Sequence, residues 1–173
     1  MSHIETTPID AERLLLEPLR VDHAETMAEV LADPGLHAFI GGEPSDAEQL
    51  RGRYARMLAG SEDPAVSWCN WVVRVRGEDR LAGTVQATVV AGVGGTTAEI
   101  AWVVGADWQG RGFAKEAARA LVGWLSEREV DTVIAHVHPE HQASAAVAAA
   151  AGLAATDEVE DGEIRWVRRL RGV

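Results

Sequence analysis

One stretch of the chain combines residue types that bind phosphate groups: Gln109-Gly110-Arg111-Gly112-Phe113-Ala114. It follows a strand-like run and precedes a strong helical pattern. Glycine allows a positive φ and lets a ligand come close to the main chain. The first turn of a helix offers unpaired N–H groups and a partial positive charge to an anion. We therefore predict that residues 109–114 form a phosphate-binding loop at the start of a helix.

Other phosphate-binding loops make further demands that this stretch does not meet. A P-loop requires Lys followed by Ser or Thr after its last glycine, whereas this chain continues Phe113-Ala114-Lys115-Glu116. A dinucleotide-binding loop requires a third glycine, an early place in the chain and an acidic residue about 20 positions later. Asp131 stands at a suitable distance, but the strands predicted before the loop are antiparallel. The sequence therefore argues against both nucleotide folds.

The patterns before the loop predict a strand, two helices and an antiparallel meander. A short apolar run predicts a strand over residues 12–19, and Asp22 caps a helix that ends at Asp33-Pro34-Gly35. A loop over residues 36–44 leads to a second helix, which begins with the capping box Ser45-Asp46-Ala47-Glu48 and ends near Leu58. Three later runs are rich in strand-forming residues and are separated by polar or glycine turns: 68–75, 81–90 and 97–104.

The patterns after the loop predict a βαβ crossover with the loop at its hinge. Residues 113–128 carry an apolar stripe at helical spacing, and the β-branched run 131–137 predicts a buried strand parallel to the strand before the helix. An alanine-rich helix over 145–151 and a hairpin of strands 154–160 and 163–170 complete the chain. The prediction is a single α/β domain over residues 1–173 with a mixed sheet.

Composition narrows the class of protein. With 173 residues, of which 47% are hydrophobic, the chain can build one full core. The single Cys69 excludes an intramolecular disulfide and a multi-cysteine metal cluster, and its apolar neighbours favour a core thiol over a nucleophile. The net charge of −11 argues against nucleic acid as a partner, and we attribute the only lysine, Lys115, to compositional bias. Because the chain has neither a secretion signal nor a long apolar segment, we expect a cytoplasmic protein without membrane association.

The loop and the order of the elements together resemble the GNAT superfamily of acyl-CoA-dependent N-acyltransferases. The family's phosphate motif, Gln/Arg-x-x-Gly-x-Gly/Ala, matches residues 109–114. Residues 98–104 look like the family's fourth strand. Residues 139–144 look like its Pro-Glu-Asn-x-x-Ser element, with His141 where the family most often has Asn. The resemblance spans residues 12–170 and is nearest in style to the branch that includes ribosomal-protein N-terminal acetyltransferases.

The resemblance implies a GNAT-like mixed sheet of six to seven strands and acetyl-CoA as co-substrate, with no metal. Backbone N–H groups of residues 109–114 would hold the CoA pyrophosphate, with Arg111 as an added charge partner. The strands at 97–104 and 131–137 would splay, and the pantetheine arm would pair with the main chain of Trp102, Val103 and Val104. His141 is either a further CoA contact or a helix-capping residue.

Catalytic roles also follow from the resemblance. Glu99 matches the place where relatives often have a glutamate that acts as base, usually through water, although an outward-facing polar residue on a strand fits as well. A backbone N–H near Val103 would stabilise the oxyanion. Many relatives carry a tyrosine acid on the penultimate helix, but Tyr54 is the only tyrosine here. Ser144 is the substitute, and helix capping is its alternative role.

The expected acceptor is a small-molecule amine or a peptide N-terminus. The net negative charge of the chain favours a basic amine, and exposed edge strands favour a homodimer. Two other classes stay open on sequence alone. One is a non-catalytic acyl-CoA-binding or regulatory module, and the other is an interaction module that uses Trp68, Trp71 and Trp102.

Overall fold

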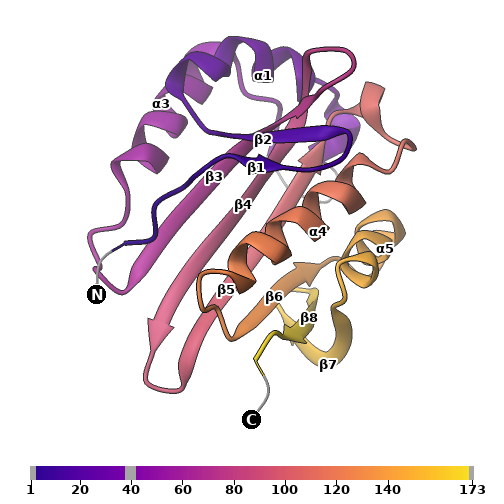
Figure 1. The fold of residues 1–173 in the computed structure, drawn as a ribbon. Helices are drawn as coiled ribbons and strands as arrows, with labels where there is room; N and C mark the ends of the chain where they lie inside the picture. The colour runs from indigo at the N-terminus through magenta and orange to yellow at the C-terminus, as the bar shows by residue number, and fades with distance from the viewer. Residues whose placement is uncertain (1–2, 38–41, 172–173) are drawn as a thin grey trace.

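A computed structural model describes residues 3–37 and 42–171. Its centre is one sheet of eight strands in the order β1-β2-β3-β4-β5-β6-β8-β7 (Figure 1). The strands are β1 (Ile9–Asp10), β2 (Leu14–Pro18), β3 (Val66–Val75), β4 (Arg80–Gly92), β5 (Gly95–Val104), β6 (Thr132–Val137), β7 (Ala154–Glu160) and β8 (Glu163–Arg169). The predicted α/β class with a mixed sheet is confirmed. The expected count of six to seven strands was too low, because the additional strand, β1, has two residues, which are too few to show a hydrophobic period.

The predicted meander and crossover are both present. Strand β4 pairs antiparallel with both β3 and β5, while β6 pairs parallel with β5. The hairpin of β7 and β8 then adds to the free edge of β6 through β8. The phosphate-loop candidate therefore lies at the hinge between an antiparallel half and a parallel return.

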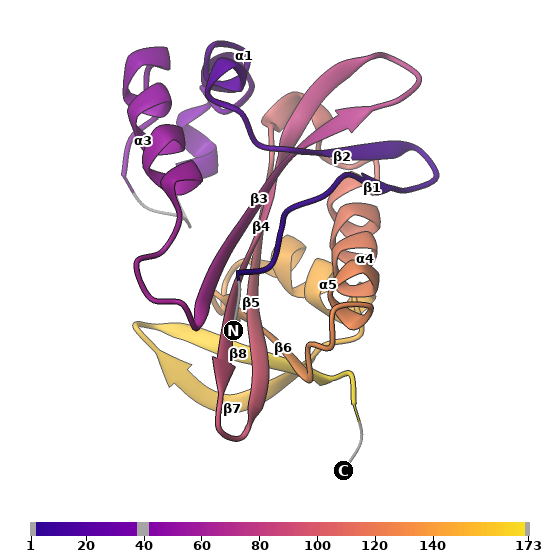
Figure 2. The ribbon, with the colours of Figure 1, turned by 60° about the vertical axis from the view of Figure 1, so that its left-hand side comes forward.

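Helices cover both faces of the sheet (Figure 2). On one side lie α1 (Ala24–Val30) and α3 (Ala47–Ala59), and on the other lie α4 (Phe113–Ser126) and α5 (Gln142–Ala150). Neighbouring residues of β3 pack on opposite faces of the sheet. Trp71 belongs to the larger core cluster with α4, and Val72 belongs to the smaller core cluster with α1 and α3. No helix in the two described ranges is long and apolar enough to cross a membrane.

Two tryptophans fix the larger core. Trp71 and Trp124 meet edge to face, with ring centroids 4.9 Å apart. Both indole N–H groups donate to Thr7, to its carbonyl oxygen at 2.8 Å and to its hydroxyl oxygen at 2.9 Å. The N-terminal segment thus satisfies two buried donors that would otherwise destabilise the core.

Some predicted helix boundaries were wrong by a few residues. Helix α3 is capped by Asp46, whose carboxylate accepts from the Gln49 N–H at 2.7 Å, so the capping box lies one residue after the predicted one. Asp22 caps nothing, because its carboxylate pairs with Arg20 at 3.0 Å. Helix α5 begins three residues before the predicted Ala145. Part of the predicted loop 36–44, residues 38–41, lies outside the described residues.

Candidate active site

The site begins where β5 and β6 separate. Their parallel pairing covers only residues 97–99 of β5 and 132–134 of β6. Beyond Glu99, β5 continues to Val104 with β4 as its partner on one side, and β6 pairs only with β8. The predicted splay is therefore present, and it leaves the end of β5 open to a strand-like ligand on its β6 side.

A cleft of about 530 Å³ occupies this opening. It brings together the end of β5, the predicted phosphate loop that follows β5 closely in the sequence, and the start of α5, which comes later in the chain. All but two of the predicted site residues line it: Trp102, Val103, Val104, Gln109, Gly110, Gly112, Phe113, Ala114, His141 and Ser144. The two that do not are Arg111 and Glu99.

The loop has the geometry that an anion site needs. Gly110 and Gly112 have φ values of +79° and +80°, a region that favours glycine. The first helical hydrogen bond of α4 runs from the Glu116 N–H to the Gly112 carbonyl at 3.1 Å. The N–H groups of Phe113, Ala114 and Lys115 therefore precede the helical ladder and are free of it. The side-chain amide of Gln109 donates to the Val104 carbonyl at 3.1 Å and ties the loop to β5.

Arg13, in the turn between β1 and β2, holds the loop from behind. Its guanidinium donates to the Arg111 carbonyl at 2.7 Å and to the Glu116 carboxylate at 2.7 Å. It also lies over the Phe113 ring, 4.8 Å from the centroid. Sequence reasoning missed Arg13, because no local pattern links it to a loop about a hundred residues later.

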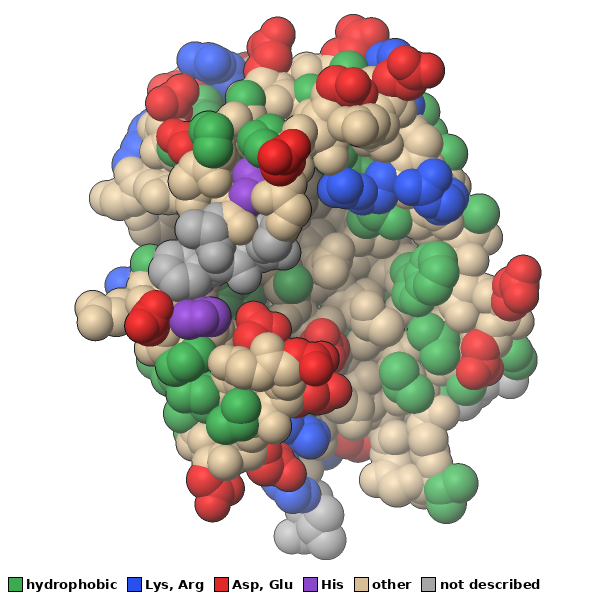
Figure 3. All heavy atoms as spheres, turned by 180° about the vertical axis from the view of Figure 1, so that it is seen from behind, with side chains coloured by type: hydrophobic (Ala, Val, Ile, Leu, Met, Phe, Trp, Pro, Cys, Tyr) green, Lys and Arg blue, Asp and Glu red, His purple; other side chains and the backbone are tan. Residues whose placement is uncertain are grey.

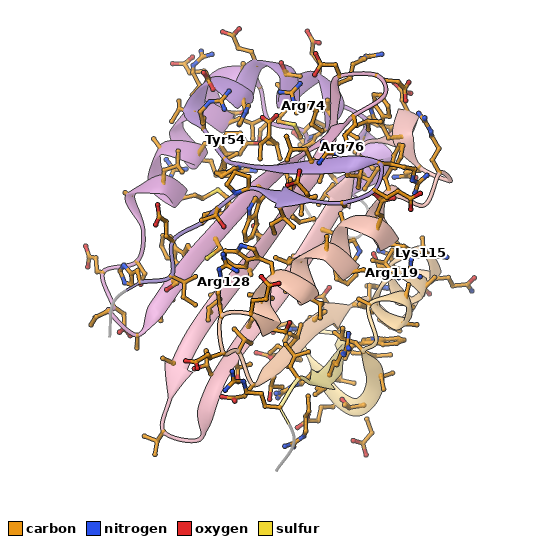
Figure 4. The ribbon with its side chains drawn as sticks, viewed as in Figure 1. Tyr54, Arg74, Arg76, Lys115, Arg119 and Arg128 are labelled. Atoms are coloured by element: carbon orange, nitrogen blue, oxygen red, sulfur yellow. The ribbon has the colours of Figure 1, made fainter. Side chains whose placement is uncertain are left out.

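The charges at the loop differ from those predicted. The Arg111 guanidinium pairs with Glu78 at 2.7 Å and lies over the rings of Phe113 and Trp108, outside the cleft. Lys115, whose occurrence the composition alone would explain, lines the cleft and projects from α4 on the side of α5 (Figure 4). Its place in the first turn after the loop was the signal that could have identified it.

The start of α5 contributes His141 and Ser144. His141 occupies the N-cap position but forms no side-chain cap bond, and Ser144 lies inside the first turn, so neither side chain caps the helix. The Ser144 hydroxyl lies 3.5 Å from Nε2 of His141. Burial lowers the pKa of His141, and the nearby His138 lowers it further. The neutral imidazole is therefore favoured at neutral pH, in keeping with a hydrogen-bonding role.

Glu99 belongs to a different group of side chains. Its carboxylate lies 3.3 Å from Nδ1 of His136, whose Nε2 lies 3.1 Å from the Glu160 carboxylate. The Glu99 side chain is 52% exposed. It shares a face of β5 with Val103, because the two residues are four apart, which is about 13 Å along a strand. Glu99 could therefore reach the open end of β5 only through water.

A second cavity, of about 190 Å³, lies on the opposite face of the sheet. It lies between α3 and strands β3 to β5, with Tyr54 and Leu50 of α3 on one wall and Asn70 and Gln86 on the other. Figure 4 places Tyr54 between α3 and the sheet. Burial raises the pKa of Tyr54, so that its hydroxyl remains a hydrogen-bond donor.

The two cavities meet at the end of β5. Val103 and Leu36 line both of them. A ligand that pairs with the β5 main chain from one side can therefore present its end to a molecule bound on the other. This juxtaposition suits a reaction between two substrates that enter from opposite faces.

Two further predictions concern Cys69 and metals. Cys69 is fully buried, and burial raises the pKa of its thiol, which confirms a core thiol and disfavours a nucleophile. Within residues 3–37 and 42–171, no group of three or more His, Cys, Asp or Glu side chains has a geometry that could hold a metal ion.

Solved structures share this fold across nearly the whole chain. An acetyltransferase of the GNAT family from Bacillus anthracis is 22% identical, with a TM-score of 0.74, over 94% of this chain and 98% of its own. A ribosomal L7/L12 alpha-N-protein acetyltransferase in complex with coenzyme A is 15% identical, with a TM-score of 0.76, over 94% and 97% of the two chains. Spermidine N-acetyltransferase from Vibrio cholerae, solved with CoA and spermine, is 16% identical, with a TM-score of 0.72, over 91% and 96%.

Sequence comparison gives the family. No curated protein sequence matches the chain. The family model described as the acetyltransferase (GNAT) domain matches residues 13–154, which is most of the chain. With the fold and the cleft at the loop, this match shows that the chain is an acyltransferase that belongs to the GNAT acetyltransferase family.

Proposed function

We propose that this enzyme transfers an acetyl group from acetyl-CoA to a primary amine, directly and within a ternary complex. The observation that carries the proposal is the meeting of two cavities at Val103, one beside the phosphate loop and one beneath α3. Two solved structures of the same fold are described as complexes with coenzyme A, which supports acetyl-CoA as the donor. The substrate of one is a ribosomal protein and the ligand of the other is spermine, so an amine acceptor fits the likeness.

Acetyl-CoA would occupy the cleft between β5, α4 and α5. The N–H groups of the loop and of the first turn of α4 would bind the pyrophosphate, and Lys115 would add a positive charge. The pantetheine arm would lie in the splay and pair with the main chain of Val103 and Val104. His141 and Ser144 would border the arm from the start of α5. Arg111 would act on the loop's conformation through Glu78 and the aromatic rings, and not on phosphate.

The chemistry needs a neutral amine, a stabilised oxyanion and a proton for the leaving thiolate. The amine attacks the thioester carbonyl carbon, the C–S bond breaks, and an amide and the CoA thiol result. A main-chain N–H near Val103 would donate to the developing oxyanion. Ser144, which lines the cleft, would donate the proton to the thiolate. Because a thiol is fairly acidic, its thiolate is a good leaving group even without a proton donor.

Glu99 would act as the base, through water, because its carboxylate lies outside both cavities. We expect Glu99→Gln to lower kcat about 100-fold, in the range that general bases contribute, without changing the affinity for acetyl-CoA. Steady-state rates combined with calorimetric titration of acetyl-CoA measure the two effects separately. Unchanged kcat would assign Glu99 to the surface pair with His136 and remove it from the mechanism.

The proposal itself is tested by the release of CoA thiol in the presence of a panel of primary amines. We expect release that depends on the amine and saturates with it. Tight binding of acetyl-CoA without release for any amine would instead indicate a non-catalytic acyl-CoA-binding module. Lack of acetyl-CoA binding would remove the assignment of the cleft.

A further inference from the structure

We infer that the cavity beneath α3 selects an amine that carries an anionic group on a compact apolar body, and that Arg53 binds this anionic group. The inference rests on the proposed function, because it treats this cavity as the acceptor site. It also replaces the expectation of a basic acceptor, which came from the net charge alone. The argument depends on which charges line the cavity, and not on the charge of the whole chain.

No carboxylate lines the part of this cavity that the described residues form. Its wall is mainly apolar, with leucines from several elements together with Tyr54 and Met57 of α3. The polar side chains on the sheet side are those of Asn70, Thr84 and Gln86, and His37 lines the cavity as well. A polyamine or another polycation would find no counter-ion there, and an unpaired buried ammonium is strongly unfavourable.

Arg53 brings a positive charge to the cavity. It lies on α3 and is exposed, which places its guanidinium at the rim. The guanidinium donates to the Ser45 hydroxyl at 3.0 Å, and among the residues described it forms no ion pair with a carboxylate. By contrast, Arg51 of the same helix pairs with Glu25 at 3.3 Å, outside the cavity. The remaining N–H donors of Arg53 match a carboxylate or phosphate oxygen.

Three acidic side chains of β5 and β7 lie beside other basic side chains. Figure 3 shows the hollow on this side, with Lys or Arg side chains along one border and Asp or Glu side chains gathered along another. The carboxylates of Glu99 and Glu160 flank His136, and Glu158 pairs with Arg165 at 3.6 Å. These groups lie on strands β5 to β8 and none of them lines the cavity. They therefore do not offset the charge of Arg53 at the rim.

The volume limits the size of the apolar body. A cavity of about 150 Å³ is enough to hold benzene, so this cavity of about 190 Å³ accommodates an aromatic or branched aliphatic group of similar size. The reacting amine would lie toward Val103, which this cavity shares with the acetyl-CoA cleft. The anionic group would lie at the rim beside Arg53 and Ser45.

The test compares two pairs of amines whose members differ in charge, 4-(2-aminoethyl)benzoate with its amide and 4-(aminomethyl)benzoate with its amide, and it uses spermidine as a cationic acceptor. For the wild-type enzyme we expect kcat/KM to be about tenfold higher for the carboxylate member of at least one pair, as one charge-assisted hydrogen bond provides. Arg53→Gln should bring the two members of that pair to similar values. Arg56→Gln, which removes an exposed charge one turn further along α3, should preserve the preference.

Calorimetric binding of the same amines to the enzyme–CoA complex separates this inference from the proposed function. If no amine is acetylated but the carboxylate members bind more tightly through Arg53, the inference holds and the proposed function fails. If spermidine or the amides are acetylated as well as the carboxylates or better, the proposed function holds and the inference is overturned. Absence of binding for every amine, or a preference that survives Arg53→Gln, also overturns it.

Discussion

Gly112→Glu is expected to weaken acetyl-CoA binding by at least about 100-fold, because three effects act together. Gly112 has a φ of +80°, which strains any other residue. A Cβ at this position would lie 3.2 Å from Nη2 of Arg13, the residue that holds the loop. The added carboxylate would stand at the N-terminus of α4, where the pyrophosphate is proposed to bind, and it would repel phosphate. Isothermal calorimetry with acetyl-CoA measures the loss.

Gly123→Glu is the matched control for that experiment. It adds the same charge to the same helix at a position where a Cβ meets nothing within 4 Å. We expect acetyl-CoA affinity within about twofold of the wild type, because charges more than a Debye length of about 8 Å apart are largely screened. If Gly112→Glu keeps a folded thermal transition and wild-type affinity, residues 109–114 are not the phosphate site.

Gly83→Ala is expected to lower the free energy of unfolding by about 3 kcal/mol, as forced overpacking does. A Cβ at Gly83 would lie 2.1 Å from the Val103 carbonyl oxygen and 3.0 Å from Cα of Val104. Both neighbours are main-chain atoms, so the end of β5 would have to move. Because the same segment is proposed to pair with pantetheine, the variant should also bind acetyl-CoA more weakly. Chemical denaturation and calorimetry measure the two losses.

Gly94→Ala, in the turn between β4 and β5, controls for the loss of a glycine from the same hairpin. A Cβ there meets nothing within 4 Å. We expect a change in unfolding free energy of less than about 1 kcal/mol, typical of a glycine substitution without strain. Equal stabilities for the two variants would mean that β4 can accommodate a side chain beside Val103, and that Gly83 does not position β5.

The long elements of this fold could be predicted from the sequence because their signals are local. The meander, the long helix after the loop and the returning strand each carry an apolar period over many residues. Helix starts were harder to predict. Ser45 and Asp46 are both good capping residues, and each is followed three positions later by Glu48 or Gln49, so the pattern could not choose between them. The short β1 exists only because β2 offers it a partner.

In the candidate site too, only the features that depend on local sequence could be predicted. The loop with Gly110 and Gly112 could be recognised because its conformation is set by its own residues. The position of Arg13 behind the loop and the ion pair that turns Arg111 away from the cleft depend on packing between distant segments. The only tyrosine, Tyr54, is absent from the penultimate helix and lines the second cavity instead. Periodicity cannot reveal a cavity formed by α3 and three strands.

The dependence of the initial rate on both substrates tests the central claim most directly. The claim is that acetyl-CoA and the amine occupy two cavities that meet at Val103 and react without an acetylated enzyme. Initial rates of CoA thiol release, measured while both substrates are varied, should give double-reciprocal lines that intersect. Parallel lines, together with an acetylated protein detected by mass spectrometry after incubation with acetyl-CoA alone, would contradict direct transfer.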